Sequence, residues 1–266
     1  MLVAARTART ANRFAPVQTR RAVGTARVRA KYGPSMRLWL HPRGSQVASG
    51  TAVAAVNDQS GRGVAITQAT ASKQPLKSAF RGVPSYRFDG VNDALEVAAI
   101  DFSATQGVTI AVVEYRSTAA FGTEYELTTD INFQTGGIGI YGNATAGDRW
   151  ECAFRGNNDY QVREVASTAQ NWRSFVAVAN KALPAASEIK IYQSGAEITS
   201  YTTSLTSENT NTFANSTSWI GSRNNGASLP LSGSIAMLVV FNRALFAGEC
   251  QALTLELAEA AGVGYV

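Results

Sequence analysis

Short apolar or alternating runs, separated by turn residues, recur along most of the chain. The run at 36–40 (MRLWL) places Leu38 and Leu40 on one face of a strand and Trp39 on the other. Residues 108–116 (VTIAVVEYR) are apolar on both faces, as in a central strand that is covered on its outer side. Further strands are expected at 64–68, 85–88, 92–98, 126–133, 137–141, 149–155, 160–165, 173–179, 188–193, 217–221 and 234–242. This spacing predicts an all-β antiparallel sandwich.

One segment near the C-terminus has a helical period instead. Over 246–261, apolar residues recur at steps of three and four, as Phe246, Cys250, Leu253, Leu257 and Ala261. A glycine follows directly and is well placed to end the helix. We expect this amphipathic helix to pack on the sandwich and to cap an exposed strand or sheet edge.

Charge divides the chain unevenly. Residues 1–57 contain ten Arg or Lys and no acid, whereas the remainder has 14 basic and 19 acidic residues. Residues 1–35 have little apolar surface, and Pro16 and Pro34 interrupt any long helix. We therefore interpret 1–35 as an extended basic arm and 36–266 as the sandwich domain.

The basic side chains of the arm favour an anionic partner, either nucleic acid or the acidic surface of another protein. They are Arg6, Arg9, Arg13, Arg20, Arg21, Arg27, Arg29 and Lys31. Aromatic residues for base stacking are nearly absent, which argues against sequence-specific recognition of single strands. The alternatives are a processed transit peptide and an expression-related tail.

Composition narrows the class of protein further. Hydrophobic residues make up 45% of the chain, enough for a sizeable core, but no apolar run is long enough for a membrane span. Cys152 and Cys250 have no second Cys or His at ligand spacing, so we expect two buried free thiols. The sequence indicates no metal and no cofactor.

Four segments together resemble a known family. They are LWL at 38–40, NDQSGRG at 57–63 with TQATASKQP at 67–75, YRFDGVNDALEV at 86–97, and WIGSRNNGASLPLSGSIAMLVVFNRAL at 219–245. In this order they resemble laminin-G/concanavalin A-like domains of bacterial surface proteins and tailed-bacteriophage virions. The resemblance implies a concanavalin-like jelly roll over residues 36–266. Relatives often have Asp after the LWL strand, where this chain has His41. We interpret this histidine as a surface-loop residue.

The resemblance and the arm together favour a structural protein of a tailed-phage virion. A capsid decoration or minor capsid protein comes first and a tail or fibre component next. In this interpretation the arm contacts other virion proteins within an oligomeric assembly, and the sandwich displays a lectin-like surface. A cell-surface glycan is a further expected partner of that surface. No contact with a membrane is expected. The main alternative is a carbohydrate-binding module of a bacterial surface protein. In either case Arg223, Asn224 and Asn225 are the polar residues that we expect to contact a sugar.

A jelly-roll glycoside hydrolase is the third alternative. Such enzymes need two carboxylates on one strand face. Glu124 and Glu126 form the best local pair by alternation, with Asp130 on the same face if the strand is regular. Their spacing differs from the Glu-x-Asp-x-x-Glu pattern of that class, so we expect solvated strand carboxylates, no catalytic residues and no enzyme. Asp89, Asn92 and Asp93 are oxygen donors that Ca²⁺ prefers, but they show no binding-loop spacing.

Overall fold

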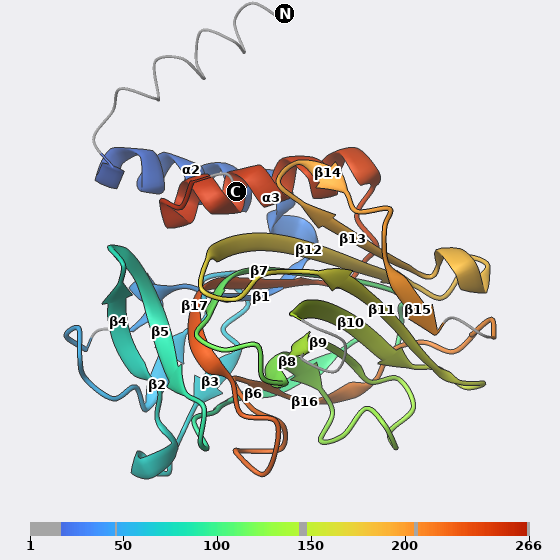
Figure 1. Cartoon of the computed structure of the whole chain (residues 1–266), viewed down its shortest axis with the longest axis horizontal. Helices are drawn as coiled ribbons and strands as arrows, with labels where there is room; N and C mark the ends of the chain where they lie inside the picture. Colours follow the sequence, from blue (N-terminus) through green and yellow to red (C-terminus); the bar gives the residue numbers. More distant parts are fainter. Residues whose placement is uncertain (1–16, 46, 144–147, 205–206, 265–266) are drawn as a thin grey trace, which may run out of the picture.

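The strands assemble into two antiparallel sheets that pack face to face (Figure 1). The computed structural model describes residues 17–45, 47–143, 148–204 and 207–264. An all-β sandwich with one C-terminal helix is therefore confirmed. The division of the chain at residue 36 stays a prediction.

Two lists give the strands in spatial order. Sheet 1 contains β14 (Ala196–Glu197), β13 (Ile189–Gln193), β12 (Trp172–Asn180), β7 (Gly107–Arg116), β17 (Ser232–Phe241), β5 (Val83–Asp89) and β4 (Leu76–Phe80), with β1 (Met36–Leu40) also paired to β17. Sheet 2 contains β15 (Thr202–Ser204), β11 (Tyr160–Ala166), β10 (Arg149–Arg155), β9 (Ile138–Asn143), β8 (Gly122–Leu127), β16 (Asn215–Ile220), β6 (Leu95–Asp101), β3 (Ala65–Thr67) and β2 (Ala55–Asn57).

The main core lies between the sheets. It is formed by inward-facing residues of both, such as Ile110 and Val112 of sheet 1 and Ile138 and Ile140 of sheet 2. Large aromatic side chains fill the space between them. Trp150 of β10, for example, stacks on an aromatic ring of β12 with 4.5 Å between centroids. Packing of this kind is the usual way in which two sheets bury their apolar faces.

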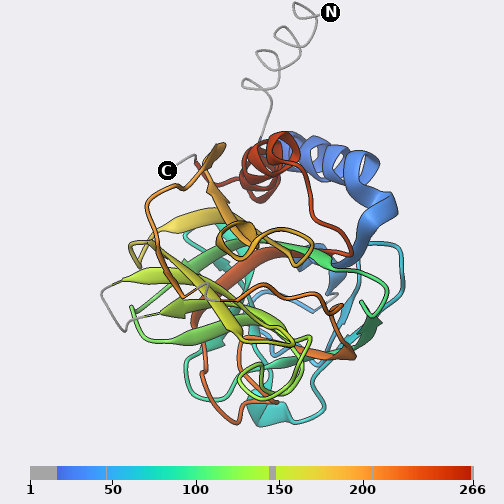
Figure 2. The same ribbon diagram turned by 90° about the vertical axis from the view of Figure 1, so that its right-hand side faces the viewer.

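A second hydrophobic cluster lies on the outer side of sheet 1, beneath two helices (Figures 1 and 2). The helix α3 (Ala247–Ala261) buries Cys250, Leu253 and Leu257 there against apolar side chains of β7, β12 and β17. The helix packs on the sandwich, as predicted, and covers mainly the outer face of sheet 1. It also reaches the sheet edge, because Thr254 Oγ1 accepts a hydrogen bond from Gly195 N–H in the turn between β13 and β14. Strand β7 is buried along its whole length, which confirms the expectation for 108–116.

The ends of α3 follow from local chemistry. Glu249 accepts a hydrogen bond from the Phe246 backbone N–H (2.9 Å) and pairs with Arg243 (2.7 Å), so it satisfies a free donor at the helix start. Gly262 adopts a left-handed conformation (φ 77°) and its N–H donates to Ala258 O. Glycine reaches this conformation at little steric cost, so it ends the helix as predicted.

The extended arm is wrong for residues 17–32, which form the helix α2 (Val17–Tyr32). Pro34 lies beyond the C-terminal end of this helix and does not break it, and Pro16 is outside the described residues. Val28 and Tyr32 are fully buried in the second cluster, beside α3. Tertiary packing therefore holds a helix whose own apolar surface is small.

Both cysteines are buried free thiols, as predicted. Burial raises the pKa of Cys152 and brings that of Cys250 to about 12, so both thiols stay protonated at ordinary pH. Among the described residues, no helix is both long and apolar enough to cross a membrane.

Candidate functional site

A buried ion pair on the outer face of sheet 2 joins two loops. Glu126, on β8, is fully buried, and Arg223 Nε donates to its Oε2 at 2.9 Å. Arg223 Nη1 lies 3.1 Å from Asp130 Oδ1. Burial raises the pKa of Glu126, while Arg223 opposes that rise. The guanidinium therefore ties the 221–231 loop to the 128–137 loop.

The 128–137 loop is held by its own polar groups as well. Ile131 N–H donates to Glu126 Oε1 and Asn132 N–H to Asp130 Oδ1, each at 2.9 Å. Ile131 is fully buried against Tyr141 on the outer face of sheet 2. The loop nevertheless leaves Phe133 84% exposed. Among the described residues, Phe133 is the most exposed of the large hydrophobic side chains.

The 221–231 loop presents an exposed amide of its own. Asn224, Asn225 and Gly226 have positive φ (46°, 57° and 80°), the left-handed conformation that Asn and Gly adopt most readily. Asn225 is anchored inward, because its Oδ1 accepts from Gln68 Nε2 at 2.9 Å and its carbonyl from Lys73 Nζ at 2.7 Å. Asn224 is exposed, and its side chain forms no hydrogen bond within the described residues.

Both loops lie on the sheet 2 side of the sandwich, away from α2 and α3 (Figures 1 and 2). The ion pair between Arg223 and Asp130 places them side by side. The exposed groups are then the Phe133 ring and the amides of Asn132 and Asn224. Such a surface suits a ligand with a flat apolar face bordered by hydroxyls, since the ring covers the face and the amides donate and accept hydrogen bonds.

Comparison with known proteins identifies the family. The family model described as the concanavalin A-like lectin/glucanases superfamily matches residues 89–251. The chain belongs to this superfamily. No curated protein matches it.

Solved structures show the same fold at low identity. A botulinum neurotoxin serotype D ligand-binding domain, solved with N-acetylneuraminic acid, has a TM-score of 0.56 and 10% identity, covering 86% of this chain and 52% of that one. A botulinum neurotoxin type C structure, described by the dependence of cell entry on two ganglioside molecules, has a TM-score of 0.53 and 14% identity, covering 86% of this chain and 52% of that one. The Trypanosoma rangeli sialidase in complex with sialic acid has a TM-score of 0.54 and 13% identity and covers 85% and 33%. The chain thus spans about half of the neurotoxin chains and a third of the sialidase.

The two carboxylates that a superfamily glucanase would need do not come together on β8. The pairing of β8 with β9 shifts between Thr123 and Tyr125, so Glu124 is the extra residue of a β-bulge. Glu124 therefore faces the core, where its Oε2 accepts from Trp150 Nε1 at 2.7 Å, whereas Glu126 binds Arg223 on the outer face. The predicted shared face is wrong, and so is the expectation that these carboxylates are solvated, since both are fully buried.

Glu124 belongs to a polar cluster between the sheets. Arg116 is 1% exposed and lies near the fully buried Glu114, with 3.7 Å between Nε and Oε1. Its Nη2 lies 2.8 Å from Asp148 Oδ1. Burial raises the pKa of Glu114 to about 7 and that of Glu124 well above its ordinary value. Gly142 makes room for this arrangement, because a Cβ there would lie 2.5 Å from Arg116 Cδ.

The basic residues predicted to bind a partner divide into three groups. Arg6, Arg9 and Arg13 lie outside the described residues, and Arg20 and Arg21 are on α2 with side chains that are also outside them. Arg27 and Lys31 instead form ion pairs with Glu259 and Glu256 of α3, at 3.8 and 3.3 Å. Arg29 is exposed and lies near Gly61. For Arg27 and Lys31, the acidic surface that they contact is that of their own domain.

Of the predicted sugar contacts, Arg223 positions the loops, Asn225 anchors one of them, and Asn224 is exposed. Sequence reasoning missed Phe133 and Asn132, although a single Phe within the polar run TTDINFQTGG is a usable signal. His41 is only 6% exposed, so the surface-loop interpretation is wrong. Asp89 and Asp93 accept backbone N–H groups of their own turn.

Proposed function

We propose that the chain is a glycan-binding module that contacts its ligand with the two loops tied together by Arg223. The observation that carries the proposal is Phe133, an 84% exposed aromatic ring on a loop that donates a backbone hydrogen bond to the buried carboxylate of Glu126. The C–H face of a pyranose packs on such a ring, and Asn132 and Asn224 supply donors and acceptors for sugar hydroxyls.

Membership of the lectin/glucanase superfamily supports this proposal. Two of the similar structures contain bound sialic acid, and the third is described by the dependence of cell entry on two ganglioside molecules. We further propose binding without cleavage, because the nearest carboxylates are engaged: Glu126 binds Arg223 and Ile131, and Asp130 binds Arg223 and Asn132. A general acid and a nucleophile both need a carboxyl that reaches the sugar.

A glycan array tests the proposal. Wild type should bind a defined set of glycans, and Phe133→Ala should lose that binding while its melting temperature stays unchanged. Phe246→Ala is the matched control, because Phe246 is also a highly exposed phenylalanine (76%) but lies at the start of α3. Equal binding by wild type and Phe133→Ala would refute the site, and binding to no glycan would refute the function.

We propose as a second candidate that the module is displayed on a phage virion, in an oligomeric assembly attached through its N-terminal residues. The supporting observation is the acid-free basic stretch of residues 1–57. Because α2 packs on α3, the informative deletion removes only residues 1–16. That deletion should abolish co-sedimentation with virions and leave glycan binding intact. Full co-sedimentation of the deleted protein would exclude attachment through this segment.

A further inference from the structure

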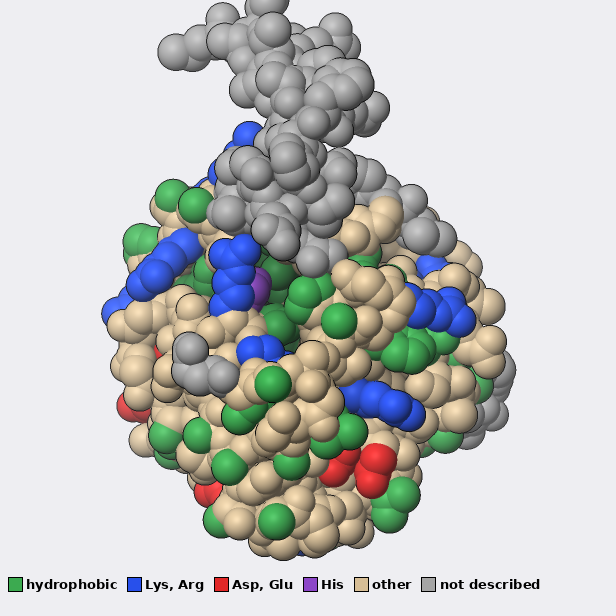
Figure 3. Space-filling view, turned by 90° about the vertical axis from the view of Figure 1, so that its left-hand side faces the viewer, with side chains coloured by type: hydrophobic (Ala, Val, Ile, Leu, Met, Phe, Trp, Pro, Cys, Tyr) green, Lys and Arg blue, Asp and Glu red, His purple; other side chains and the backbone are tan. Residues whose placement is uncertain are grey.

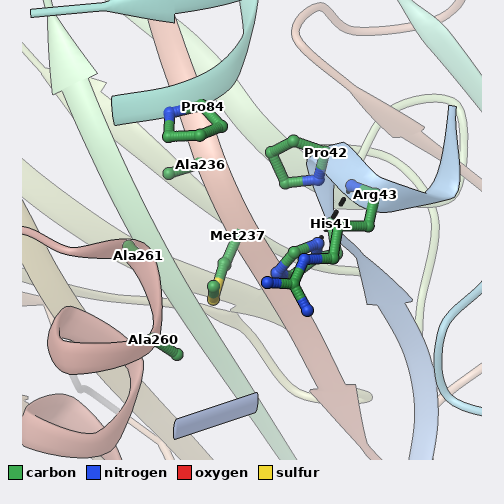
Figure 4. A pocket seen from close by; sticks show the side chains of 8 residues that line it. All are labelled: His41, Pro42, Arg43, Pro84, Ala236, Met237, Ala260 and Ala261. Atoms are coloured by element: carbon green, nitrogen blue, oxygen red, sulfur yellow. Dashed lines mark hydrogen bonds between the residues drawn. The ribbon is translucent and has the colours of Figure 1, made fainter. Parts of the chain in front are cut away.

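A cavity of about 240 Å³ lies at the outer side of sheet 1, far from the loops proposed to bind glycans (Figures 3 and 4). Its lining residues are His41, Pro42, Arg43, Pro84, Ala236, Met237, Ala260 and Ala261. The volume equals that of about eight water molecules at ~30 Å³ each. The cavity therefore has room for a small organic molecule.

The cavity exists because β17 changes its edge partner at this point. Strand β5 pairs with β17 as far as Ile235, and β1 pairs with it from Leu238 onward. Between these positions the pairing of β17 with β7 contains a bulge, so the consecutive residues Ala236 and Met237 both belong to the outer cluster. The small side chains Ala260 and Ala261, at the end of α3, leave the space above them open.

His41 supplies a fixed hydrogen-bond donor. Its Nδ1 accepts from Arg43 N–H at 3.0 Å, its carbonyl accepts from Tyr86 O–H at 2.9 Å, and its ring meets Trp39 edge to face. Burial lowers the pKa of His41 to about 4, so the imidazole is neutral. Since Nδ1 is the acceptor, Nε2 carries the proton. Figure 4 shows this ring beside Met237 in the cavity.

Arg43 supplies a positive charge at the cavity. No ion pair of Arg43 is found among the described residues, and the cavity lining contains no Asp or Glu. In Figure 3 the histidine lies in a hollow beside Lys or Arg side chains, while the acidic side chains on this face lie away from it. Figure 4 shows Arg43 and His41 close together at one side of the apolar lining.

We propose that this cavity binds an amphiphilic monoanion, a carboxylate with a short apolar chain. The carboxylate accepts from the guanidinium of Arg43 and from Nε2–H of His41, and the chain lies over Met237 and the alanines. Planar guanidinium groups bind carboxylates through charge-assisted hydrogen bonds. Six of the eight lining residues are apolar, which disfavours a sugar here.

Methionine methyl NMR tests this proposal with few signals. The chain has three methionines, and of the two that the structure describes, Met36 and Met237, Met237 lines the cavity. With ¹³C-methyl methionine, octanoate should shift the Met237 signal saturably and leave Met1 and Met36 unchanged. 1-Octanol, which has the same chain without the charge, should bind wild type at least about tenfold more weakly than octanoate does. Octanoate should bind Arg43→Gln more weakly by a similar factor. Each change removes a hydrogen bond that involves a charged group.

Arg155→Gln, which removes an arginine from β10 of sheet 2, is the matched control and should bind octanoate like wild type. A filled cavity gives a second check, because Ala261→Leu should abolish the Met237 shift while glycan binding persists. The proposal is overturned by a Met237 signal that does not respond, by equal affinities for octanoate and 1-octanol, or by an Arg43→Gln variant that binds like wild type.

Discussion

Replacing Arg223 by Gln removes the only cation bound to Glu126 among the described residues. Glu126 would keep the hydrogen bond from Ile131 N–H but no cation among the described residues, in a position without solvent exposure. A buried carboxylate has lost its hydration, and the paired cation compensates for that loss. Without the cation the loss is uncompensated and the folded state becomes less stable. Arg223→Gln therefore tests whether this pair organises the loops.

The expected loss follows from the burial of the pair. Breaking a buried ion pair by removing one partner destabilises proteins by ~3–5 kcal/mol. The Arg223 side chain is 11% exposed and water can reach its place, so we take the lower end, ~3 kcal/mol at pH 8. For a chain of this size that loss lowers the melting temperature by about 6–12 °C.

The loss should depend on pH. Without Arg223 the folded-state pKa of Glu126 rises further above its unfolded value, because burial is no longer opposed. A carboxyl whose pKa is higher in the folded than in the unfolded state does not affect stability at a pH below its unfolded-state pKa. It lowers the free energy of unfolding as the pH increases from there through its folded-state pKa. The difference between wild type and Arg223→Gln in the free energy of unfolding should therefore be larger at pH 8 than at pH 5.

Urea denaturation at both pH values, together with amide hydrogen exchange, measures these effects. The double variant Glu126→Gln/Arg223→Gln should recover part of the stability at pH 8, because no charge remains buried, and the Ile131 amide should exchange faster in Arg223→Gln. Arg155→Gln serves as the control, with a change within ~0.5 kcal/mol. A loss for Arg223→Gln that is below ~1 kcal/mol and equal at the two pH values would refute the reasoning.

Three further predictions concern other buried groups. Glu124→Gln should be more stable than wild type at pH 8 and equal to it near pH 4 by urea denaturation, because the raised pKa makes the wild-type carboxyl lose stability as the pH increases; no difference at pH 8 would contradict this. Burial lowers the pKa of Lys181 to about 7. Between pH 7 and pH 10 the lysine is protonated in the unfolded chain but not in the folded one, so wild type should become more stable as the pH increases. Lys181→Met should lack this gain in the same assay. Tyr32→Ala should cost ~3–5 kcal/mol in thermal unfolding, whereas Arg27→Gln should change little; the reverse order would show that ion pairs and not apolar packing hold α2.

The sandwich was predictable because its signals are local. The run at 108–116 is apolar on both faces and becomes the central strand β7, and the three- and four-residue steps of 246–261 become α3. Alternation and helical period act over a few residues, so a sequence displays them directly.

The features that the sequence did not predict depend on contacts between distant residues or on one irregularity. A single bulge in β8 sends Glu124 to the core, although strict alternation puts it beside Glu126. Arg223 finds its partner across 97 positions of sequence, which no local pattern reveals. The helix α2 has a weak apolar face of its own and depends on burial of Val28 and Tyr32 against the rest of the domain.

The direct test of the proposed function is an amide NMR titration with a glycan selected by the array. We expect saturable shifts at Asn132, Phe133 and Asn224 and at their neighbours in the two loops, and loss of those shifts in Phe133→Ala. Shifts that fall elsewhere and leave the 128–137 and 221–231 loops unchanged would contradict the account.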